Sequence, residues 1–222
     1  MPINARYRGP SDLPAVIPVF PLAGALLLPR GQLPLNIFEP RYLAMIDDAL
    51  RDGHRLIGMI QPDGAHETEP PTLFQTGCVG RITQLAESGD GRYIIELTGV
   101  ARFRTKEELE VNTDYRQCRV NYMPFVDDFV ARKGEDAVDC ESLLRALTAF
   151  MKANEMSADW DDIAQAPTEA LVNGLSMMCP YGTAEKQALL EAPDLKTRAE
   201  LLVAITEIEL AKKNIEGEPP LQ

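Results

Sequence analysis

Few side chains in this chain have the residue types and the spacing that metal binding needs. His54 and His66 are the only histidines, and the segment His66-Glu-Thr-Glu-Pro70 lacks the second histidine of the helical zinc motif. We expect each histidine to lie in a loop or at a helix end. The four cysteines stand far apart and form no Cys-x-x-Cys pair, so they indicate neither a zinc site nor a disulfide scaffold. We expect four buried or half-buried thiols and no bound metal.

The sequence also lacks the motifs of ATP hydrolysis and of serine hydrolases. A phosphate-binding loop requires a Gly-Lys step, and the chain contains no Gly-Lys dipeptide. Close to Ser176, Met178 occupies the position at which a nucleophile elbow has its closing glycine. The acidic run Asp159-Trp-Asp-Asp162 could suggest a metal site, but its place at an expected helix start favours helix capping. We therefore predict no catalytic residue and no cofactor.

The charge balance makes nucleic acid an unlikely partner. The chain has 22 Lys and Arg residues against 34 Asp and Glu residues, which gives a formal net charge of -12. Phosphate backbones should be repelled by such a chain. The sequence has no apolar run of the roughly 18 residues that a transmembrane helix needs, and its first residues do not resemble a secretory signal. We expect a cytoplasmic protein without a membrane partner.

The first elements are two short strands followed by a helix. The segment Val16 to Leu22 is apolar but carries Pro18 and Pro21, which cannot donate to a ladder, so we expect it at a sheet edge or at bends. A second apolar run follows from Leu33 to Phe38.

Pro40 is well suited to open the predicted helix, because proline favours the first helical position. This helix should run from Pro40 to Arg51 and stop near Gly53. Glu39 and Arg41 flank Pro40 and could either bind a ligand or hold the strand-to-helix junction together, and we favour the structural role. On that view Arg41→Ala should cost about 1–3 kcal/mol of stability.

The hydrophobic period changes along the chain. Four further apolar runs are expected to be strands: Arg55 to Ile60, Gly77 to Leu85, Tyr93 to Phe103 and Tyr115 to Tyr122. Asp90-Gly91 predicts a hairpin in which both turn residues have positive φ. After residue 138 the apolar spacing becomes helical, with breaks at Pro167 and Pro180. The predicted fold is therefore α+β, with a mostly antiparallel β lobe that contains one helix, followed by an all-helical bundle.

The predicted domain organisation divides the chain into five parts. These are a flexible N-terminus (1–15), a β-rich lobe (16–126), a linker (127–138), a helical lobe (139–215) and a disordered tail (216–222).

Three segments together resemble one known family. They are Ile17-Pro-Val-Phe-Pro-Leu22 with Leu33-Pro-Leu-Asn-Ile-Phe-Glu-Pro-Arg-Tyr-Leu-Ala-Met45, the glycine-led strand at Gly77 with the hairpin after Gly91, and Lys186-Gln-Ala-Leu-Leu-Glu191. This combination is similar to the Lon substrate-binding domain, the amino-terminal module of the ATP-dependent Lon protease, which also occurs as a free-standing protein in bacteria. The resemblance implies a PUA-like β lobe and a role in proteolysis, without the ATPase and Ser-Lys protease domains of Lon.

The function implied by this resemblance is a non-catalytic module that binds unfolded or degradation-prone polypeptide segments. A protease or a chaperone is a further candidate partner. An RNA-associated PUA-like module and a small hydrolase are the alternatives; net acidity counts against the first, and the missing nucleophile and base against the second. The candidate binding residues are the large apolar side chains near the expected junction of the lobes, although core packing explains them about as well: Phe38, Tyr42, Met123 and Phe125.

Overall fold

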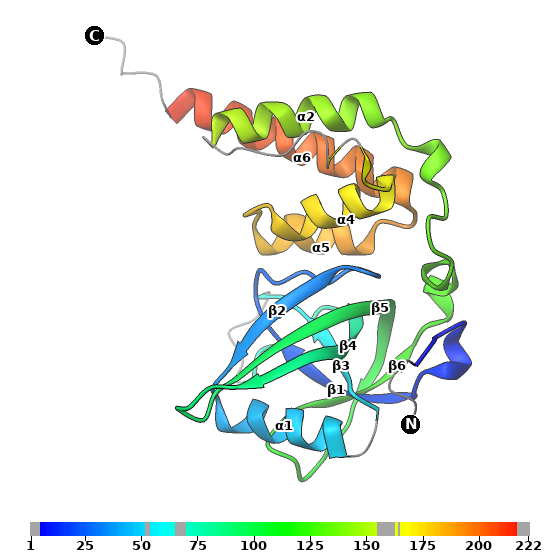
Figure 1. Cartoon of the computed structure of the whole chain (residues 1–222), viewed down its shortest axis with the longest axis vertical. Coiled ribbons are helices and arrows are strands. Elements are labelled where there is room, and N and C mark those ends of the chain that lie inside the picture. The colour runs from blue at the N-terminus through cyan, green and yellow to red at the C-terminus, as the bar shows by residue number, and fades with distance from the viewer. Residues whose placement is uncertain (1–4, 52–53, 65–69, 155–162, 164, 217–222) are drawn as a thin grey trace.

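A computed structural model describes residues 5–51, 54–64, 70–154, 163 and 165–216. It confirms the α+β class: a six-stranded sheet, five strands of which close into a barrel, lies under a layer of helices (Figure 1). The strands are β1 (Val16–Pro21), β2 (Gln32–Ile37), β3 (Leu56–Ile60), β4 (Thr76–Glu87), β5 (Tyr93–Glu108) and β6 (Gln117–Asn121). Their order is β2-β5-β4-β3-β1-β6, and β6 also pairs with β5, which closes the barrel.

Of the two places predicted for the first strand, a sheet edge or a bend, the sheet edge is wrong, because β1 has two neighbours. Its first half pairs antiparallel with β6, with Pro18 opposite Gln117, and its second half pairs parallel with β3, with Val19 opposite Gly58. The strand changes partner between Pro18 and Val19. Neither the β1–β6 ladder nor the β1–β3 ladder therefore runs through the whole strand. Each can accommodate one proline, which has no backbone N–H to donate.

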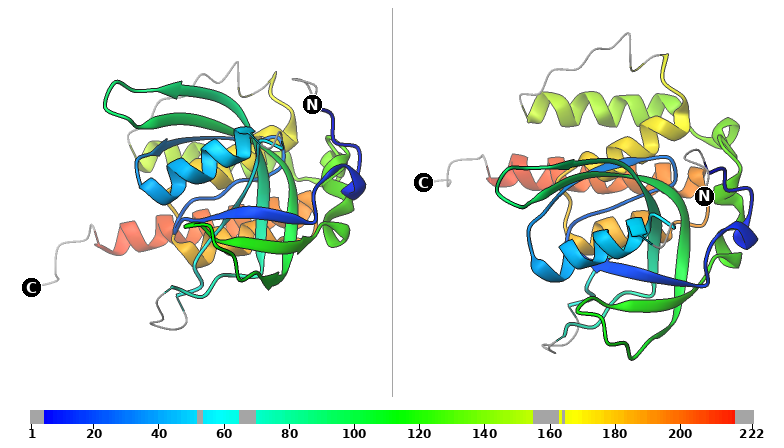
Figure 2. Two further views of the ribbon diagram at one scale, coloured as in Figure 1. Left: turned by 90° about the horizontal axis from the view of Figure 1, so that it is seen from below. Right: turned by 60° about the horizontal axis from the view of Figure 1, so that its bottom comes forward.

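The edge strand is β2, which among the described strands alone has a single neighbour. It pairs with residues 93–98 of β5, and Pro34 lies in its middle. On the other side of β5, the stretch 83–87 of β4 continues past its last contact with β3 and has no partner on its outer edge within the described chain. We call β2, residues 83–87 and residues 93–98 the arm; its hairpin projects beyond the barrel (Figure 2).

The hairpin of the arm is confirmed, but its turn differs from the predicted type. Gly91 has a φ of 79°, whereas Asp90 is not among the residues with positive φ. The Gly91 N–H donates to the Ser88 carbonyl at 3.0 Å, and the Ser88 N–H donates to the Arg92 carbonyl at 2.8 Å. A longer loop thus needs only one left-handed residue, and Gly91 supplies it.

The predicted first helix is confirmed as α1 (Pro40–Arg51), which lies against the barrel on the side away from the other helices (Figure 1). Its buried face carries Tyr42, Met45, Ile46 and Ala49. Gly53, the expected stop, lies outside the described residues, as do His66 and the acidic run 159–162.

The remaining helices are α2 (Cys140–Ala153), α4 (Thr168–Met178), α5 (Thr183–Glu191) and α6 (Leu195–Glu216). Three 3-10 helices complete the fold: η1 (Pro10–Asp12), η2 (Met123–Phe129) and η3 (Glu135–Ala137). In Figure 1, α4 and α5 lie between the barrel and the pair formed by α2 and α6. No described helix is long and apolar enough to cross a membrane.

One hydrophobic core joins the barrel to the helices. Buried barrel residues such as Leu28 and Leu97 belong to the same cluster as Val172 and Leu189 of the helical part. A second cluster contains buried side chains from β1, β3, β4, β5 and β6, among them Phe103. The segment 5–15, which the sequence analysis assigned to the N-terminus, contacts the barrel. Leu13 is buried and Tyr7 packs against the second cluster.

Candidate functional site

The junction between the barrel and the helices is filled by a buried ion pair. Arg102 of β5 and Asp128 of η2 are only 3% and 7% exposed. The Arg102 Nη2 and Nε donate to the two Asp128 oxygens at 2.8 and 2.9 Å, and the Arg102 backbone N–H donates to Oδ2 at 2.8 Å. Arg102 Nη1 also donates to the carbonyls of Leu190 and Ala192 at 3.0 and 2.5 Å, and the guanidinium lies 4.6 Å above the Phe125 ring. One barrel side chain therefore holds both η2 and the end of α5.

Two glutamines make a second polar connection across the junction. Gln61 is 1% exposed, and its Nε2 donates to Gln187 Oε1 at 3.1 Å and to the Thr183 carbonyl at 3.2 Å. Gln187 Nε2 donates to the carbonyl of Thr76 at 3.2 Å. Buried polar groups therefore cross the junction beside the shared hydrophobic core and are hydrogen-bonded to one another.

A second buried arginine, Arg198 of α6, lies close to Arg102. Its Nε donates to the Leu189 carbonyl and its Nη1 to Asn173 Oδ1, both at 2.9 Å, while Nη2 has no hydrogen-bond partner among the described residues. Burial, and then the neighbouring Arg102, lower the pKa of Arg198 to about 10. Arg102 and Arg198 therefore lie close together beside one buried carboxylate, Asp128.

The structure does not bring the four candidate binding residues together. Phe38 and Met123 are 61% and 63% exposed, whereas Tyr42 and Phe125 are buried. The Tyr42 ring packs on Phe20 with 4.2 Å between ring centroids, so it belongs to the core. Phe38 lies two residues before α1 and Met123 begins η2, and these elements lie on different sides of the barrel (Figure 1). Phe38 and Met123 alone are open to a ligand.

The Glu39 and Arg41 pair forms, but it is not buried. Arg41 Nη2 lies 2.7 Å from Glu39 Oε2, and the two side chains are 53% and 42% exposed, respectively. The guanidinium also lies 4.6 Å above the Tyr42 ring. An exposed ion pair contributes only about 0–1 kcal/mol, so the stability loss predicted for Arg41→Ala is too large.

The expectation for the cysteines needs one correction. Cys78, Cys118 and Cys179 are buried, but Cys140 at the start of α2 is exposed. Burial raises the pKa of Cys118 to about 11. His54 is exposed next to β3, and its carbonyl accepts from Arg81.

The arm carries an exposed apolar patch on its outer face. Ile94 is 54% exposed and pairs with Ala86 of β4 on one side and with Asn36 of β2 on the other. Phe38 follows Asn36 by two residues, which places it diagonally beside Ile94 because alternate residues share a face. We call Phe38, Ala86 and Ile94 the arm patch.

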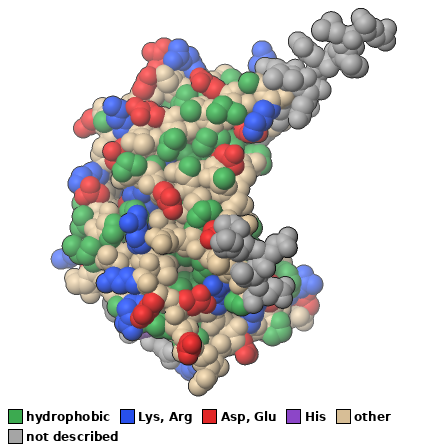
Figure 3. All heavy atoms as spheres, turned by 180° about the vertical axis from the view of Figure 1, so that it is seen from behind, with side chains coloured by type: hydrophobic (Ala, Val, Ile, Leu, Met, Phe, Trp, Pro, Cys, Tyr) green, Lys and Arg blue, Asp and Glu red, His purple; other side chains and the backbone are tan. Residues whose placement is uncertain are grey.

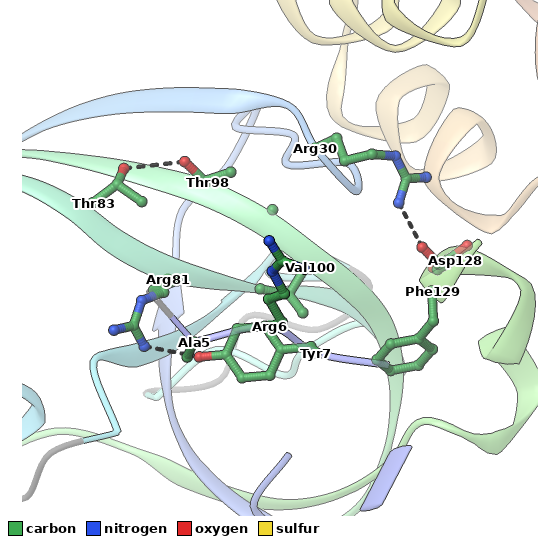
Figure 4. Close-up of a pocket in the computed structure, with 11 residues that line it drawn as sticks. Ala5, Arg6, Tyr7, Arg30, Arg81, Thr83, Thr98, Val100, Asp128 and Phe129 are labelled. Atoms are coloured by element: carbon green, nitrogen blue, oxygen red, sulfur yellow. Dashed lines mark hydrogen bonds between the residues drawn. The ribbon is translucent and has the colours of Figure 1, made fainter. Parts of the chain in front are cut away.

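Alternate residues of β5 continue this outer face into a cavity. Glu96 and Thr98 follow Ile94 at every second position. Val100 comes next, at a register shift opposite Val79 and Gly80, and lines a cavity of about 380 Å³. The N-terminal segment forms another wall with Arg6 and Tyr7, as Figure 4 shows. From Ile94 to Val100 the strand covers about 20 Å, which is the length of a six-residue extended peptide.

The polar groups of this cavity are partly fixed by one another. Arg81 Nη1 donates to the Tyr7 hydroxyl at 2.9 Å, and the hydroxyls of Thr83 and Thr98 lie 3.0 Å apart. The sequence analysis missed this surface. The alternation of buried and exposed residues from Tyr93 to Thr98 could have indicated it, because Ile94 is an apolar residue on the otherwise polar face.

Viewed from behind, the molecule shows apolar side chains among charges of both signs, and its outline is indented between the helical part and the barrel (Figure 3). Within the described part of the chain, no group of three His, Cys, Asp or Glu side chains is placed to hold a metal ion.

Comparison with known proteins identifies the family. Residues 16–207 match the substrate-binding domain of the ATP-dependent protease La (LON). The chain belongs to the Lon substrate-binding domain family. Lon protease 2 of Myxococcus xanthus is 29% identical over 202 residues, which are 87% of this chain and 24% of that protein. Lon protease of Anaeromyxobacter dehalogenans is 28% identical over 201 residues, 87% of this chain and 23% of that protein. The Lon substrate-binding domain described here therefore spans about a quarter of the length of these relatives, and only this domain of Lon matches.

Two solved structures share the Lon substrate-binding fold. The Lon N-terminal domain protein from Xanthomonas campestris has a TM-score of 0.59 and 23% identity, covering 85% of this chain and 97% of that one. The N-terminal domain of the Mycobacterium avium complex Lon protease has a TM-score of 0.65 and 18% identity, covering 86% and 98%.

Proposed function

We propose that this Lon substrate-binding domain binds extended segments of unfolded or degradation-prone polypeptides, without catalysing a reaction, and passes them to a protease or a chaperone in the cytoplasm. The match of residues 16–207 to a substrate-binding domain carries this proposal. The bound segment lies along the outer face of the arm, with apolar side chains on the arm patch.

The geometry of the arm supports an extended ligand. The arm patch presents Phe38 and Ile94, both more than half exposed. It lies at one end of a strip about 20 Å long, which we define as the outward-facing residues of β5 from Ile94 to Val100. The junction between barrel and helices, in contrast, is occupied by the buried contacts of Arg102 and Gln61. Binding through so small an apolar surface should be micromolar, on the order of -8 kcal/mol at 1 µM.

The test is a titration of a fluorescently labelled, uncharged, apolar-rich peptide, followed by anisotropy. Ile94→Gln and Phe38→Ser should each weaken binding about fivefold or more. Ile208→Gln is the matched control, since Ile208 is 55% exposed on α6, and it should leave binding unchanged. Met123→Gln tests whether η2 contributes. Unchanged affinity in Ile94→Gln and Phe38→Ser would contradict the proposed surface.

Salt dependence separates this function from RNA binding. Apolar contacts are barely screened, whereas phosphate contacts weaken steeply as salt rises. The peptide should therefore bind equally at low and high salt. Tight, salt-sensitive binding of single-stranded RNA without peptide binding would replace the proposal. Turnover of ATP or casein that a single substitution abolishes would contradict the non-catalytic role.

A further inference from the structure

The cavity at the end of the strip has an unusual charge for this chain. Three arginines line it, Arg6, Arg30 and Arg81, although the whole chain has a net charge of -12. Asp128 is the one carboxylate among the described lining residues, and it is already held by Arg102.

Two of the three arginines are engaged. Arg30 donates through Nε to Glu169 at 3.0 Å and through Nη1 to the Asp128 carbonyl at 2.6 Å. Arg81 donates to the Tyr7 hydroxyl and to the His54 carbonyl. Arg6, which is exposed, makes no hydrogen bond or ion pair through its guanidinium with any residue that the structure describes. In Figure 4 its side chain lies beside Val100, between Arg81 on one side and Phe129 and Arg30 on the other.

We infer that the Arg6 end of this cavity is a subsite for a carboxylate on the bound polypeptide, either an acidic side chain or a free carboxyl terminus. The inference rests on the proposed function, because the cavity continues the strip that starts at the arm patch. A single unengaged guanidinium matches a group with one negative charge, which it can bind through two parallel hydrogen bonds. A phosphate dianion would require a second free cation.

The residues around Arg6 determine where the carboxylate of the ligand lies and which kind of side chain can lie next to it. Glu96 Oε1 accepts from Thr83 at 3.2 Å, so a second carboxylate at the Thr83 end would be repelled. At the other end, Tyr7, Val100 and Phe129 are half-buried apolar groups packed on the second core cluster. The subsite therefore selects a carboxylate with an apolar side chain next to it.

The net charge of the protein determines how a difference in affinity between acidic and neutral peptides is interpreted. A chain of net charge -12 repels acidic ligands at long range. A preference for the acidic analogue would therefore indicate a local cation or hydrogen-bond donor, and the arginine variants identify which. For an exposed ion pair the preference should be about two- to fivefold.

The experiment is an NMR titration with short blocked peptides that differ in charge alone. Acetyl-Leu-Glu-amide is compared with acetyl-Leu-Gln-amide for a side-chain carboxylate, and acetyl-Leu-Ala with its amide for a carboxyl terminus. The acidic member of at least one pair should shift the amide signals of Tyr7, Gly99 and Val100 at two- to fivefold lower concentration. The pair that shows the preference identifies the source of the carboxylate.

Matched arginine variants decide whether Arg6 is responsible. Arg6→Gln should remove the preference and Arg6→Lys should retain most of it, while Arg8→Gln should keep it, since Arg8 is exposed in the same segment but does not line the cavity. Equal binding of acidic and neutral probes to the unmodified protein, or a preference that survives Arg6→Gln, would overturn the inference. Loss of the preference in Arg8→Gln as well would also overturn it.

These outcomes are separate from those of the proposed function. The uncharged peptide of the anisotropy titration does not need Arg6, so its binding tests the arm patch alone. Failure of that peptide together with a carboxylate preference at Arg6 would reject polypeptide capture by the arm and leave an anion site.

Discussion

Asp128 compensates two buried arginines at the junction of barrel and helices. It accepts four hydrogen bonds from Arg102, two of them shared by Nε, and its charge also favours the charged form of Arg198. A buried cation that loses its carboxylate keeps its desolvation cost without the compensating attraction. The stability of the junction therefore depends on this one side chain.

We predict that Asp128→Ala lowers the free energy of unfolding by about 3–5 kcal/mol in urea titrations. Asp127→Ala is the control, because Asp127 pairs with Lys133 on the surface, where the two side chains are 61% and 53% exposed. It should cost less than about 1 kcal/mol. Equal losses of unfolding free energy in the two variants would show that the buried ion pair contributes no more to stability than the exposed one.

Two glycines within secondary-structure elements differ in the space that a Cβ atom would find. Gly99 of β5 lies against the loop before β2: its N–H donates to the Gly31 carbonyl, and a Cβ at Gly99 would lie 2.0 Å from the Leu28 carbonyl oxygen. Gly174 lies within α4, and a Cβ there would meet nothing within 4 Å.

Gly99→Ala should therefore reduce stability by about 3 kcal/mol or more, because a backbone must move to admit the methyl group. Gly174→Ala should raise stability by up to about 1 kcal/mol, the helix propensity difference between the two residues. Thermal and urea unfolding of both variants measure these changes. A stabilised Gly99→Ala protein would contradict the close approach of the loop to β5.

The start of α6 is held by a carboxylate cap. The Thr197 N–H donates to Asp194 Oδ1 at 2.8 Å, and this bond lowers the pKa of Asp194 below its ordinary value of 3.8. A lowered pKa in the folded state adds stability above the unfolded pKa, and this stability is lost as the pH falls through the folded pKa.

We predict that Asp194→Ala is less stable than the unmodified protein at neutral pH and that the difference shrinks below about pH 3.8. Asp194→Asn keeps an acceptor for Thr197 without titrating, so it should retain most of the cap with a weaker dependence on pH. Unfolding curves at neutral and acidic pH measure both. A constant difference for Asp194→Ala across this range would exclude the ionised cap as its cause.

For the whole molecule, individual helices and strands could be predicted from the sequence, whereas the pairing of the strands could not. Pro40 and Asp90-Gly91 specify α1 and the hairpin from a few neighbouring residues. The partner change of β1 and the closure of β5 on β6 depend on residues far apart in sequence, and a repeat of apolar residues does not say which strand pairs with which.

The candidate site shows the same limit. Phe38 was predictable as a large apolar residue beside a strand-to-helix corner, and it is exposed. Tyr42 and Phe125 are also aromatic, but they are buried: Tyr42 packs on Phe20, and Phe125 lies under the Arg102 guanidinium. Residue type alone cannot distinguish an exposed aromatic side chain from a buried one. Arg6 was missed because only the fold brings the N-terminal segment beside β5.

The shared core and the contacts of Arg102 predict that barrel and helices unfold together. Far-ultraviolet circular dichroism follows mainly the helices, whereas tyrosine absorbance follows mainly the barrel, since Tyr181 alone among the described tyrosines belongs to the helical part. The two midpoints in urea should coincide. A helical transition at lower urea than the tyrosine transition would show that the junction does not couple them.

Pro34 has a consequence for the protein in concentrated solution. An open strand edge can recruit the same strand of another copy and so begin a fibre. On β2 the row of outward-facing donors is interrupted by a residue that has none. Two copies that meet along β2 cannot form an uninterrupted ladder of backbone hydrogen bonds. The β2 edge can therefore stay exposed to water without leading to fibre growth.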